Sequence, residues 1–437
     1  MSTLPTPPAE FLRHLSNHPQ TPTRELLRPY LSFEAWLRKA FARGDLEIDG
    51  LTNLVPVYNG HEDSFRIRTI DYQTANREKY LMPLPDDKRE EDGAPAIMTS
   101  LKEYRRNFDA FTHDWSNIVV AGSAALLPLL SRRKDVVIRG DPAVEDPLET
   151  YFQTVARASD IDIFFYGLDD EDAAIGRIIE LEAIVRRNQR LFSGKGLSLR
   201  SRNAITFISP KWPYRHVQII LRLYKSISEI LTGFDVDCAC VAFDGKQVYT
   251  NPRGVTAIAT RTNSIDLSRR SPSYENRLWK YRNQNFEVFC DSLERSRIDQ
   301  SYFEEFVYNV EDLSKLTGLA RLVFSEAVLN RPYRSYWRKR YLQKIDDGGE
   351  PALTTPSGYA SHDIPYGEQF TADKVCEYVK KHSKEPYLFG TLEEVVIHGA
   401  QPSRKRSGEL AGKVTFIKDN PGRQMIGSFY PLNEDDW

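Results

Sequence analysis

Apolar and acidic residues alternate in two short stretches of this chain, and the alternation predicts two β-strands. The sequence SDIDIFF contains Asp160 and Asp162, and the sequence FDVDCACV contains Asp235 and Asp237. Successive side chains of a strand point to opposite faces, so we expect both aspartates of each pair on one face. Like charges side by side repel each other, and a half-buried strand disfavours aspartate. A divalent cation would remove the repulsion, and a solvated edge strand is the alternative explanation.

Elsewhere the spacing of apolar residues predicts a mixed α/β protein with antiparallel strands. Helical spacing occurs at residues 25–42 and 171–187, and a further helix is expected from residue 100 to about residue 114. Ser226 and Glu229 form a capping-box pattern before a short helix that ends near Gly233. Further strands are expected at residues 117–120, 204–208, 216–223 and 247–250, the last of which follows an Asp-Gly hairpin turn at 244–245.

Charge and proline content divide the chain into three regions. Residues 83–95 (PLPDDKREEDGAP) form a charged, proline-flanked segment that predicts a boundary. We therefore expect a mostly helical N-terminal region at 1–95, an α+β core at 96–290, and a mixed helical C-terminal region with an aromatic tail at 291–437. Residues 132–159 are expected to form an inserted loop within the core.

A Gly-Ser pair stands between the strand expected at 117–120 and the helix after it. Gly122 allows the backbone to approach a phosphate closely, and Ser123 adds a hydroxyl donor at a helix N-terminus, where N–H groups attract anions. Serine is also a common helix N-cap, which is the purely structural explanation. The pair gains interest because it precedes the first acidic strand.

Composition and charge exclude several classes of protein. The chain has 437 residues, 41% of them hydrophobic, and a formal net charge of −2, so any binding of nucleic acid would need a local patch. Four cysteines without metal-ligand spacing exclude a disulfide framework and favour no zinc site. No apolar run is long enough for a membrane span, and no secretory signal is visible. We therefore expect an intracellular protein, cytoplasmic or nuclear, with no membrane partner.

A basic segment with aromatic residues follows the second acidic stretch. It reads RTNSIDLSRRSPSYENRLWKYR, and its Ser-Pro pair predicts the start of a helix. Either this helix presents a solvated basic face above an aromatic underside, or its cations bind the phosphates of a substrate. The cations at stake are Arg269, Arg270, Arg277 and Lys280.

The order of these motifs resembles the polymerase-beta-like nucleotidyltransferase superfamily. The likeness rests on Gly122-Ser123, on the pair formed by Asp160 and Asp162, and on a later acid. In that family the Gly-Ser turn holds a triphosphate and three carboxylates hold two metal ions. The resemblance implies a mixed sheet of nucleotidyltransferase type, with Ser123 near the phosphates and the aspartate pair at the metal ions.

The third metal ligand implied by the resemblance is Asp235, with Asp237 as the alternative. The similar region covers about residues 117–282, and the inserted loop separates the Gly-Ser turn from the first acidic strand. Part of this region also resembles a divergent, little-characterised group of proteins, some of which are joined to ankyrin repeats. That second likeness supplies no activity.

These motifs predict a metal-dependent nucleotidyltransferase that uses Mg²⁺ or Mn²⁺. It would transfer a nucleoside monophosphate from an NTP, such as ATP, to a hydroxyl of a nucleic acid, a protein or a small molecule and release pyrophosphate. Arg202, Arg222 and Lys225 are candidate triphosphate ligands, because each lies beside a core strand or a helix start. Two alternatives remain: a binding module of the same fold that lacks catalysis, and a metal-dependent nuclease that uses the same acids.

Overall fold

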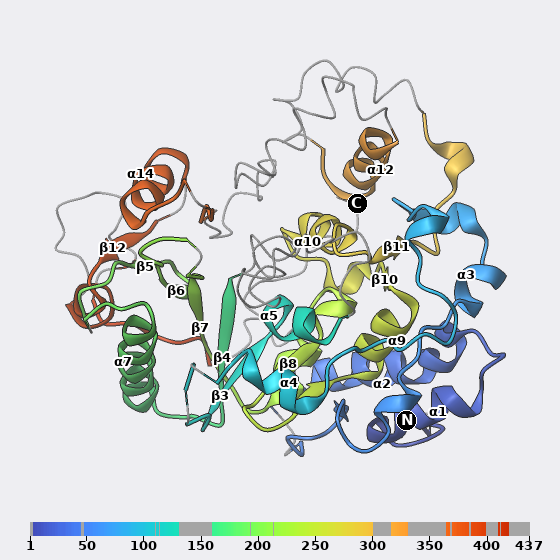
Figure 1. Cartoon of the computed structure of the whole chain (residues 1–437), viewed down its shortest axis with the longest axis horizontal. Coiled ribbons are helices and arrows are strands. Elements are labelled where there is room, and N and C mark those ends of the chain that lie inside the picture. Colours follow the sequence, from blue (N-terminus) through green and yellow to red (C-terminus); the bar gives the residue numbers. More distant parts are fainter. Residues whose placement is uncertain are drawn as a thin grey trace, which may run out of the picture.

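An open, mixed β-sheet forms the centre of the fold in this computed structural model (Figure 1). The structure describes residues 3–44, 48–130 without 110 and 113, 160–299 without 193 and 213, 316–330, 364–398 without 368, 384 and 385, and 410–418 without 411. Within these residues the sheet has nine strands, in the order β1 (Val55–Pro56), β9 (Val248–Thr250), β8 (Val241–Phe243), β3 (Ile118–Ala121), β4 (Ile161–Tyr166), β7 (Val217–Tyr224), β6 (Ala204–Phe207), β5 (Ser198–Arg200) and β12 (Leu388–Gly390).

Strand directions make this a mixed sheet. β4 and β7 run parallel, whereas the other neighbouring pairs of the sheet are antiparallel. A smaller sheet joins β10 (Thr262–Ser264), β11 (Glu287–Phe289) and β2 (Tyr80–Leu81). The mixed α+β class expected from the sequence is therefore confirmed.

Helices surround the sheet, and several begin or end where the sequence supplies a cap. Ser100 and Glu103 form a capping box, and the Asp170 carboxylate accepts two N–H groups of the helix that follows it. Figure 1 shows α7 at one end of the molecule and α1, α2 and α9 gathered at the other. The described α-helices are α1 (Phe11–Asn17), α2 (Thr23–Arg43), α3 (Ile70–Thr74), α4 (Leu101–Arg106), α5 (Ser123–Leu126), α7 (Glu171–Asn188), α8 (Ile227–Thr232), α9 (Pro252–Thr260), α10 (Tyr274–Arg282), α12 (Gly318–Leu329) and α14 (Ala372–His382).

The two faces of the central strands are buried in different apolar clusters. Val120, Ile163 and Ile219 belong to the main cluster, together with the apolar stripe of α7. Val119 and Phe164 point the other way and belong to a cluster that contains the apolar residues of α8. Since side chains alternate along β4, Asp162 lies on the Phe164 face.

Most of the predicted elements in the described residues are present. The helices predicted at 25–42 and 171–187 are α2 and α7, and the strands predicted at 204–208 and 216–223 are β6 and β7. The Asp-Gly turn joins β8 to β9, and Gly245 has the positive φ, 89°, that this turn requires.

Three local predictions are wrong. The stretch FDVDCACV is not a strand: Asp237–Ala239 form a 3₁₀ turn, and β8 begins only at Val241. The helix expected to reach residue 114 ends at Arg106, and α10 begins at Tyr274 with Ser273 at its N-cap instead of beginning at the Ser-Pro pair. Tertiary contacts decide each of these cases, as the site below shows for the first and the third.

The inserted loop at 132–159 and most of the aromatic tail lie outside the described residues, and the division into three regions stays a prediction. None of the described helices combines the length and the apolar character needed to cross a membrane.

The central strands should dominate stability. Ile219 of β7 is fully buried, so Ile219→Ala should lower the free energy of unfolding by about 2–5 kcal/mol through lost burial and a cavity. Ile179 of α7 is 41% exposed, and Ile179→Ala should change it by less than about 1 kcal/mol. Urea denaturation followed by circular dichroism compares the two variants. Similar losses at both positions would contradict the assignment of the core.

Candidate functional site

The pairing of β3 with β4 brings the Gly-Ser turn beside the first acidic pair. Ala121 at the end of β3 lies opposite Asp162 near the start of β4. Gly122 follows directly, with a φ of 77° that favours glycine, and its N–H donates to the Val241 carbonyl over 3.0 Å. Ser123 then begins α5. Two motifs separated by a long stretch of sequence therefore meet where β3 ends and β4 begins.

Asp162 is the least satisfied acid of this site. Its Oδ1 atom is buried and has no hydrogen-bond partner within the described part of the chain. Burial raises the pKa of Asp162 well above its usual range, and the neighbouring Asp160 raises it further. Lys280 and Arg277 of α10 oppose this rise. The acidic pair thus faces cations from a helix that is remote in sequence.

Asp235 joins the same neighbourhood through Arg277. The Arg277 Nη2 atom lies 2.7 Å from Asp235 Oδ2, and the Ser271 hydroxyl donates to the same oxygen over 2.7 Å. Arg277 is therefore an ion-pair partner of Asp235 and an electrostatic neighbour of Asp162. The buried Tyr281 ring lies near Arg277 as well, and burial, rather than these charges, is the main reason for the raised pKa of its hydroxyl.

Asp237 belongs to a separate, buried network. Its Oδ1 atom lies 2.9 Å from Arg253 Nη1, and its Oδ2 atom accepts the Ser264 N–H over 2.8 Å. Glu34 of α2 pairs with Arg253 at 3.1 Å and with Arg269 at 3.2 Å. Burial raises the pKa of Asp237, and Arg253 opposes the rise. The two acids of FDVDC thus have different surroundings, and Asp235 is the one that shares Arg277 as a neighbour with Asp162.

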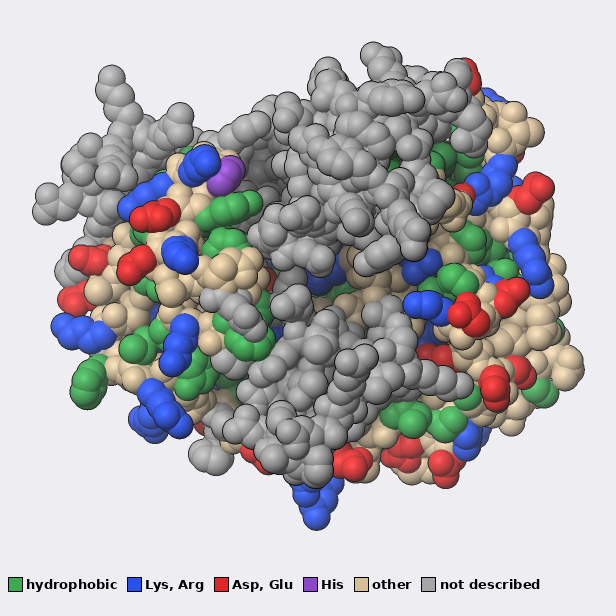
Figure 2. Space-filling view, turned by 45° about the horizontal axis from the view of Figure 1, so that its top comes forward, with side chains coloured by type: hydrophobic (Ala, Val, Ile, Leu, Met, Phe, Trp, Pro, Cys, Tyr) green, Lys and Arg blue, Asp and Glu red, His purple; other side chains and the backbone are tan. Residues whose placement is uncertain are grey.

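The predicted basic stripe is corrected by these contacts. Arg269 is buried against Glu34, and Arg270 is buried with its Nη2 atom 2.7 Å from Glu275. Only Arg277 and Lys280 of the four predicted cations are neighbours of Asp162. On the face drawn in Figure 2, Lys and Arg side chains are interspersed with Asp and Glu over the described residues. The cations that matter here are therefore local to the acids.

The candidate triphosphate ligands lie at the other end of the sheet. In the parallel register of β4 and β7, Ile161 faces Val217 and Tyr166 faces Tyr224, so Arg222 and Lys225 lie far along β7 from the acids. Arg222 is buried and lies 3.6 Å from Glu229. Arg202 precedes Ala204, which pairs with Ile220, and thus lies at the same distant end. None of the three is brought to the acidic pair.

Sequence reasoning missed residues that precede β7. Arg215 is partly buried, and burial lowers its pKa while Tyr366 and Asp160 raise it. The next residue, His216, accepts the Ser209 N–H at Nδ1 over 3.0 Å and its Nε2 lies 3.2 Å from the Pro365 carbonyl. The sequence offered no signal for these residues, because only the parallel pairing of β4 with β7 in the structure sets the starts of both strands side by side.

A metal site is not preformed among the described residues, where no group of three or more His, Cys, Asp and Glu side chains could hold an ion as placed. The donor set nevertheless fits a hard cation, because the unsatisfied Asp162 oxygen would gain a partner and the repulsion from Asp160 would fall. The Oδ2 atom of Asp235 could contribute only after its contacts with Arg277 and Ser271 are released.

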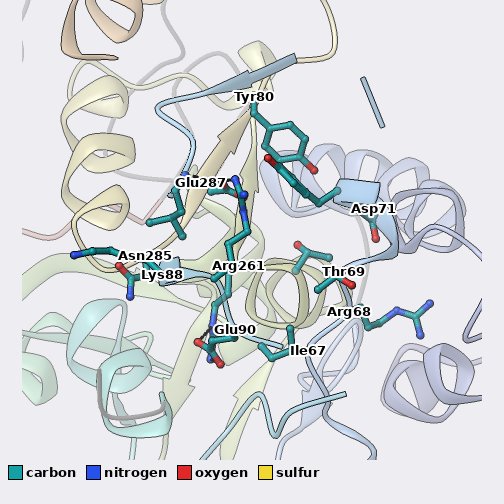
Figure 3. Close-up of a pocket in the computed structure, with 14 residues that line it drawn as sticks. Ile67, Arg68, Thr69, Asp71, Tyr80, Lys88, Glu90, Arg261, Asn285 and Glu287 are labelled. Carbon is teal, nitrogen blue, oxygen red and sulfur yellow. Dashed lines mark hydrogen bonds and ion pairs between the residues drawn. The ribbon is translucent and has the colours of Figure 1, made fainter. Parts of the chain in front are cut away.

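A pocket away from the acids is too small to compete as a nucleotide site. It has a volume of about 40 Å³ and lies among the segments around β2, α9 and β11 (Figure 3). Its charged side chains pair with one another, since Arg261 Nε lies 2.8 Å from Glu90 and Arg89 Nη2 lies 2.6 Å from Glu287. These pairs explain the pocket as packing between the N-terminal segment and the core.

Comparison with known proteins finds two similarities. Residues 98–261 match the Gabija anti-defense 2 family. An uncharacterized protein of Acanthamoeba polyphaga mimivirus is 28% identical over 261 residues, which cover 57% of this chain and 56% of that protein. The chain therefore matches a little over half the length of this curated relative. No solved structure matches the chain. The family match includes the Gly-Ser turn and all four aspartates but ends before α10.

The two acids of FDVDC should differ in their effect on stability. Asp237→Asn removes the negative partner of the fully buried Arg253 and should lower the free energy of unfolding by about 3–5 kcal/mol. Asp235→Asn should cost less, about 1 kcal/mol, because its partner Arg277 keeps 32% of its side chain exposed. Urea unfolding of both variants provides the comparison. A larger loss for Asp235→Asn would reverse the roles given to the two acids.

Asp162 should make stability depend on pH in the absence of metal ions. Its pKa is raised in the folded state, so the folded protein holds a proton that the unfolded chain releases above about pH 4. The free energy of unfolding therefore falls as pH rises from about 4 through the folded pKa. The Asp162→Asn variant has no carboxyl group to ionise at this position. Its free energy of unfolding should therefore exceed that of the wild type by an amount that grows with pH.

Urea titrations in EDTA at several pH values measure this difference. Asp169→Asn is the matched control, because Asp169 is an exposed acid beyond the other end of β4. It should show no such growing advantage. If the difference in free energy of unfolding between Asp162→Asn and wild type stays constant with pH, the charged Asp162 carboxylate does not destabilise the fold as proposed.

Proposed function

We propose that this protein is a metal-dependent nucleotidyltransferase whose site lies where β3 ends and β4 begins. The observation that carries the proposal is the register that sets Ala121, and hence the Gly-Ser turn, beside Asp162. A glycine turn can approach a phosphate closely, and the Asp162 oxygen without a hydrogen-bond partner can accept a cation, so a metal-bound nucleotide would suit both features. Asp235, Arg277 and Lys280 extend the same neighbourhood.

The chain's own residues would divide the work as follows. Asp160 and Asp162 would hold Mg²⁺ or Mn²⁺, and Asp235 would complete the set when released by Arg277. Backbone N–H groups at the start of α5 and the cations of α10 would bind the triphosphate. In such a site divalent cations help to activate the attacking hydroxyl and neutralise the leaving pyrophosphate.

The transfer itself balances as a substitution at phosphorus. The acceptor oxygen forms a bond to the α-phosphorus, and the bond from that phosphorus to the bridging oxygen breaks. Pyrophosphate leaves with the electron pair of that bond, and the hydroxyl proton passes to solvent. The role of Gly122 is to keep the backbone close to the phosphates, and the role of the α10 cations is to balance their charge.

The similarity to the Gabija anti-defense 2 family supports a biological setting for this activity. We propose that the site serves an anti-defense role of the kind that the family name states. The matched segment contains every proposed acidic ligand, which links that role to the site. The acceptor would then be a macromolecule or nucleotide of the defended cell.

A binding module without catalysis is the second candidate. Two observations favour it: Asp235 Oδ2 is already occupied by Arg277 and Ser271, and no three-acid metal group is present among the residues described. Such a module would bind nucleotide through the Gly-Ser turn and α10 without transferring phosphorus.

Incubation with labelled NTPs, Mg²⁺ or Mn²⁺ and mixed acceptors tests the activity. Wild type should label an acceptor and release pyrophosphate, which separates it from a nuclease. Asp160→Asn and Asp162→Asn should each lower the rate at least about 1000-fold, because loss of metal binding removes several kcal/mol of transition-state stabilisation. Asp169→Asn should keep the wild-type rate. Nucleotide binding without any labelled product would favour the binding module instead.

A further inference from the structure

Arg277 and Ser271 both contact Asp235 Oδ2 and would compete with a metal ion for this oxygen. The Arg277 Nη2 atom lies 2.7 Å from Asp235 Oδ2 and donates a hydrogen bond to the Ser271 hydroxyl, which itself donates to that carboxylate oxygen over 2.7 Å. Two donors therefore converge on Asp235 Oδ2. A carboxylate oxygen in this state is poorly available to a cation.

The same guanidinium also faces the first acidic pair. Arg277 and Lys280 lie one helical turn apart on α10, and both are electrostatic neighbours of Asp162. Because the Asp162 Oδ1 atom has no hydrogen-bond partner within the described part of the chain, Arg277 is close to this acid without satisfying it. Asp235 is thus neutralised by Arg277, whereas one oxygen of Asp162 has no hydrogen-bond partner in the described part of the chain.

We propose that Arg277 is an exchangeable counter-ion, which holds Asp235 while the site is empty and moves to the phosphates of an incoming nucleoside triphosphate when Asp235 turns to a metal ion. The inference rests on the proposed function and deepens it. It makes the metal ion and the triphosphate bind cooperatively, because each needs Arg277 to leave Asp235. Cooperativity of this kind is reciprocal, so each ligand should raise the affinity of the other by the same factor.

Exposure makes this exchange feasible for Arg277 and not for Arg253. Arg277 keeps 32% of its side chain accessible, so its guanidinium can swing toward a ligand without losing all solvation. Arg253 also pairs with an acid of FDVDC, but its side chain is only 1% exposed and is fixed by Glu34 as well. Within the described residues, the segment FDVDC therefore carries a fixed pair, Asp237–Arg253, and a more exposed pair, Asp235–Arg277.

Binding measurements can detect the exchange without any turnover. The affinity for Mn²⁺ is measured from the electron paramagnetic resonance signal of the unbound ion, with and without a non-hydrolysable ATP analogue. Binding of the analogue is measured by calorimetry. Arg277→Gln should raise Mn²⁺ affinity in the absence of nucleotide by about threefold to fivefold, since a partly exposed ion pair no longer has to be broken. The same variant should bind the analogue more weakly and lose most of the cooperativity.

Lys280→Gln is the matched control. It removes the same charge one turn away but breaks no contact with Asp235, so it should weaken analogue binding while changing Mn²⁺ affinity by less than about twofold. A double-mutant cycle adds a second control: in an Asp235→Asn background, Arg277→Gln should no longer raise Mn²⁺ affinity. Melting curves of all variants verify that the fold is kept.

The possible outcomes separate the inference from the proposed function. If wild type binds Mn²⁺ and the analogue, but Arg277→Gln weakens both or Lys280→Gln raises Mn²⁺ affinity equally, the exchange is overturned while the function stands. If wild type binds neither ligand, or if Mn²⁺ binding is unchanged in Asp162→Asn, the proposed function is overturned and the exchange with it. Opposite changes in the two affinities, confined to Arg277→Gln, support it.

Discussion

The antiparallel register between β3 and β4 is the constraint on which the candidate site depends. Ala121 faces Asp162 in that register, and the Gly-Ser turn follows Ala121 without an intervening residue. Because side chains alternate along a strand, a slip by one residue would move Asp162 to the face occupied by Ile163 and bury it in the main core. Apolar residues on both faces of β4 fix the register, and the position of the acids is a consequence of that packing.

A buried network of ion pairs holds the second acidic segment in place near the candidate site. Glu34 of α2 binds Arg253 and Arg269, and Arg253 also binds Asp237. Removing one member would leave a buried charge without compensation, which costs more than the pair contributes. The network therefore ties the N-terminal helix to the turn that carries Asp235. It also shows that charged residues near the site divide into fixed structural partners and groups that remain accessible.

Local sequence patterns predicted the first acidic pair well and the second one poorly. Asp160 and Asp162 alternate with residues that are buried on both faces of a central strand, so periodicity alone gave their placement. Asp235 and Asp237 show the same alternation, yet Arg253 and the Ser264 N–H hold Asp237 in a 3₁₀ turn. These partners lie later in the chain, and a pattern within eight residues contains no information about them.

The cations also show that a local sequence pattern does not reveal tertiary contacts. Arg269 and Arg277 look alike in sequence, but one is buried against Glu34, which is more than 200 residues earlier, while the other remains partly exposed beside Asp235. Arg222 looked like a phosphate ligand because it lies on a core strand, but the parallel register with β4 sets it at the distant end. Strand order and register, which the sequence does not state, decide which charges meet.

The chemical character of the candidate site comes from the Asp162 carboxylate, which the fold satisfies only in part. Asp162 keeps a buried oxygen without a hydrogen-bond partner in the described structure, while Arg277 and Lys280 stand close by and do not satisfy it. A fold selected for stability alone would pair such an oxygen or replace the acid, because burying an uncompensated carboxylate lowers stability. A ligand that brings a cation to the unsatisfied Asp162 oxygen would remove this cost, and under the proposed function a metal-bound triphosphate is such a ligand.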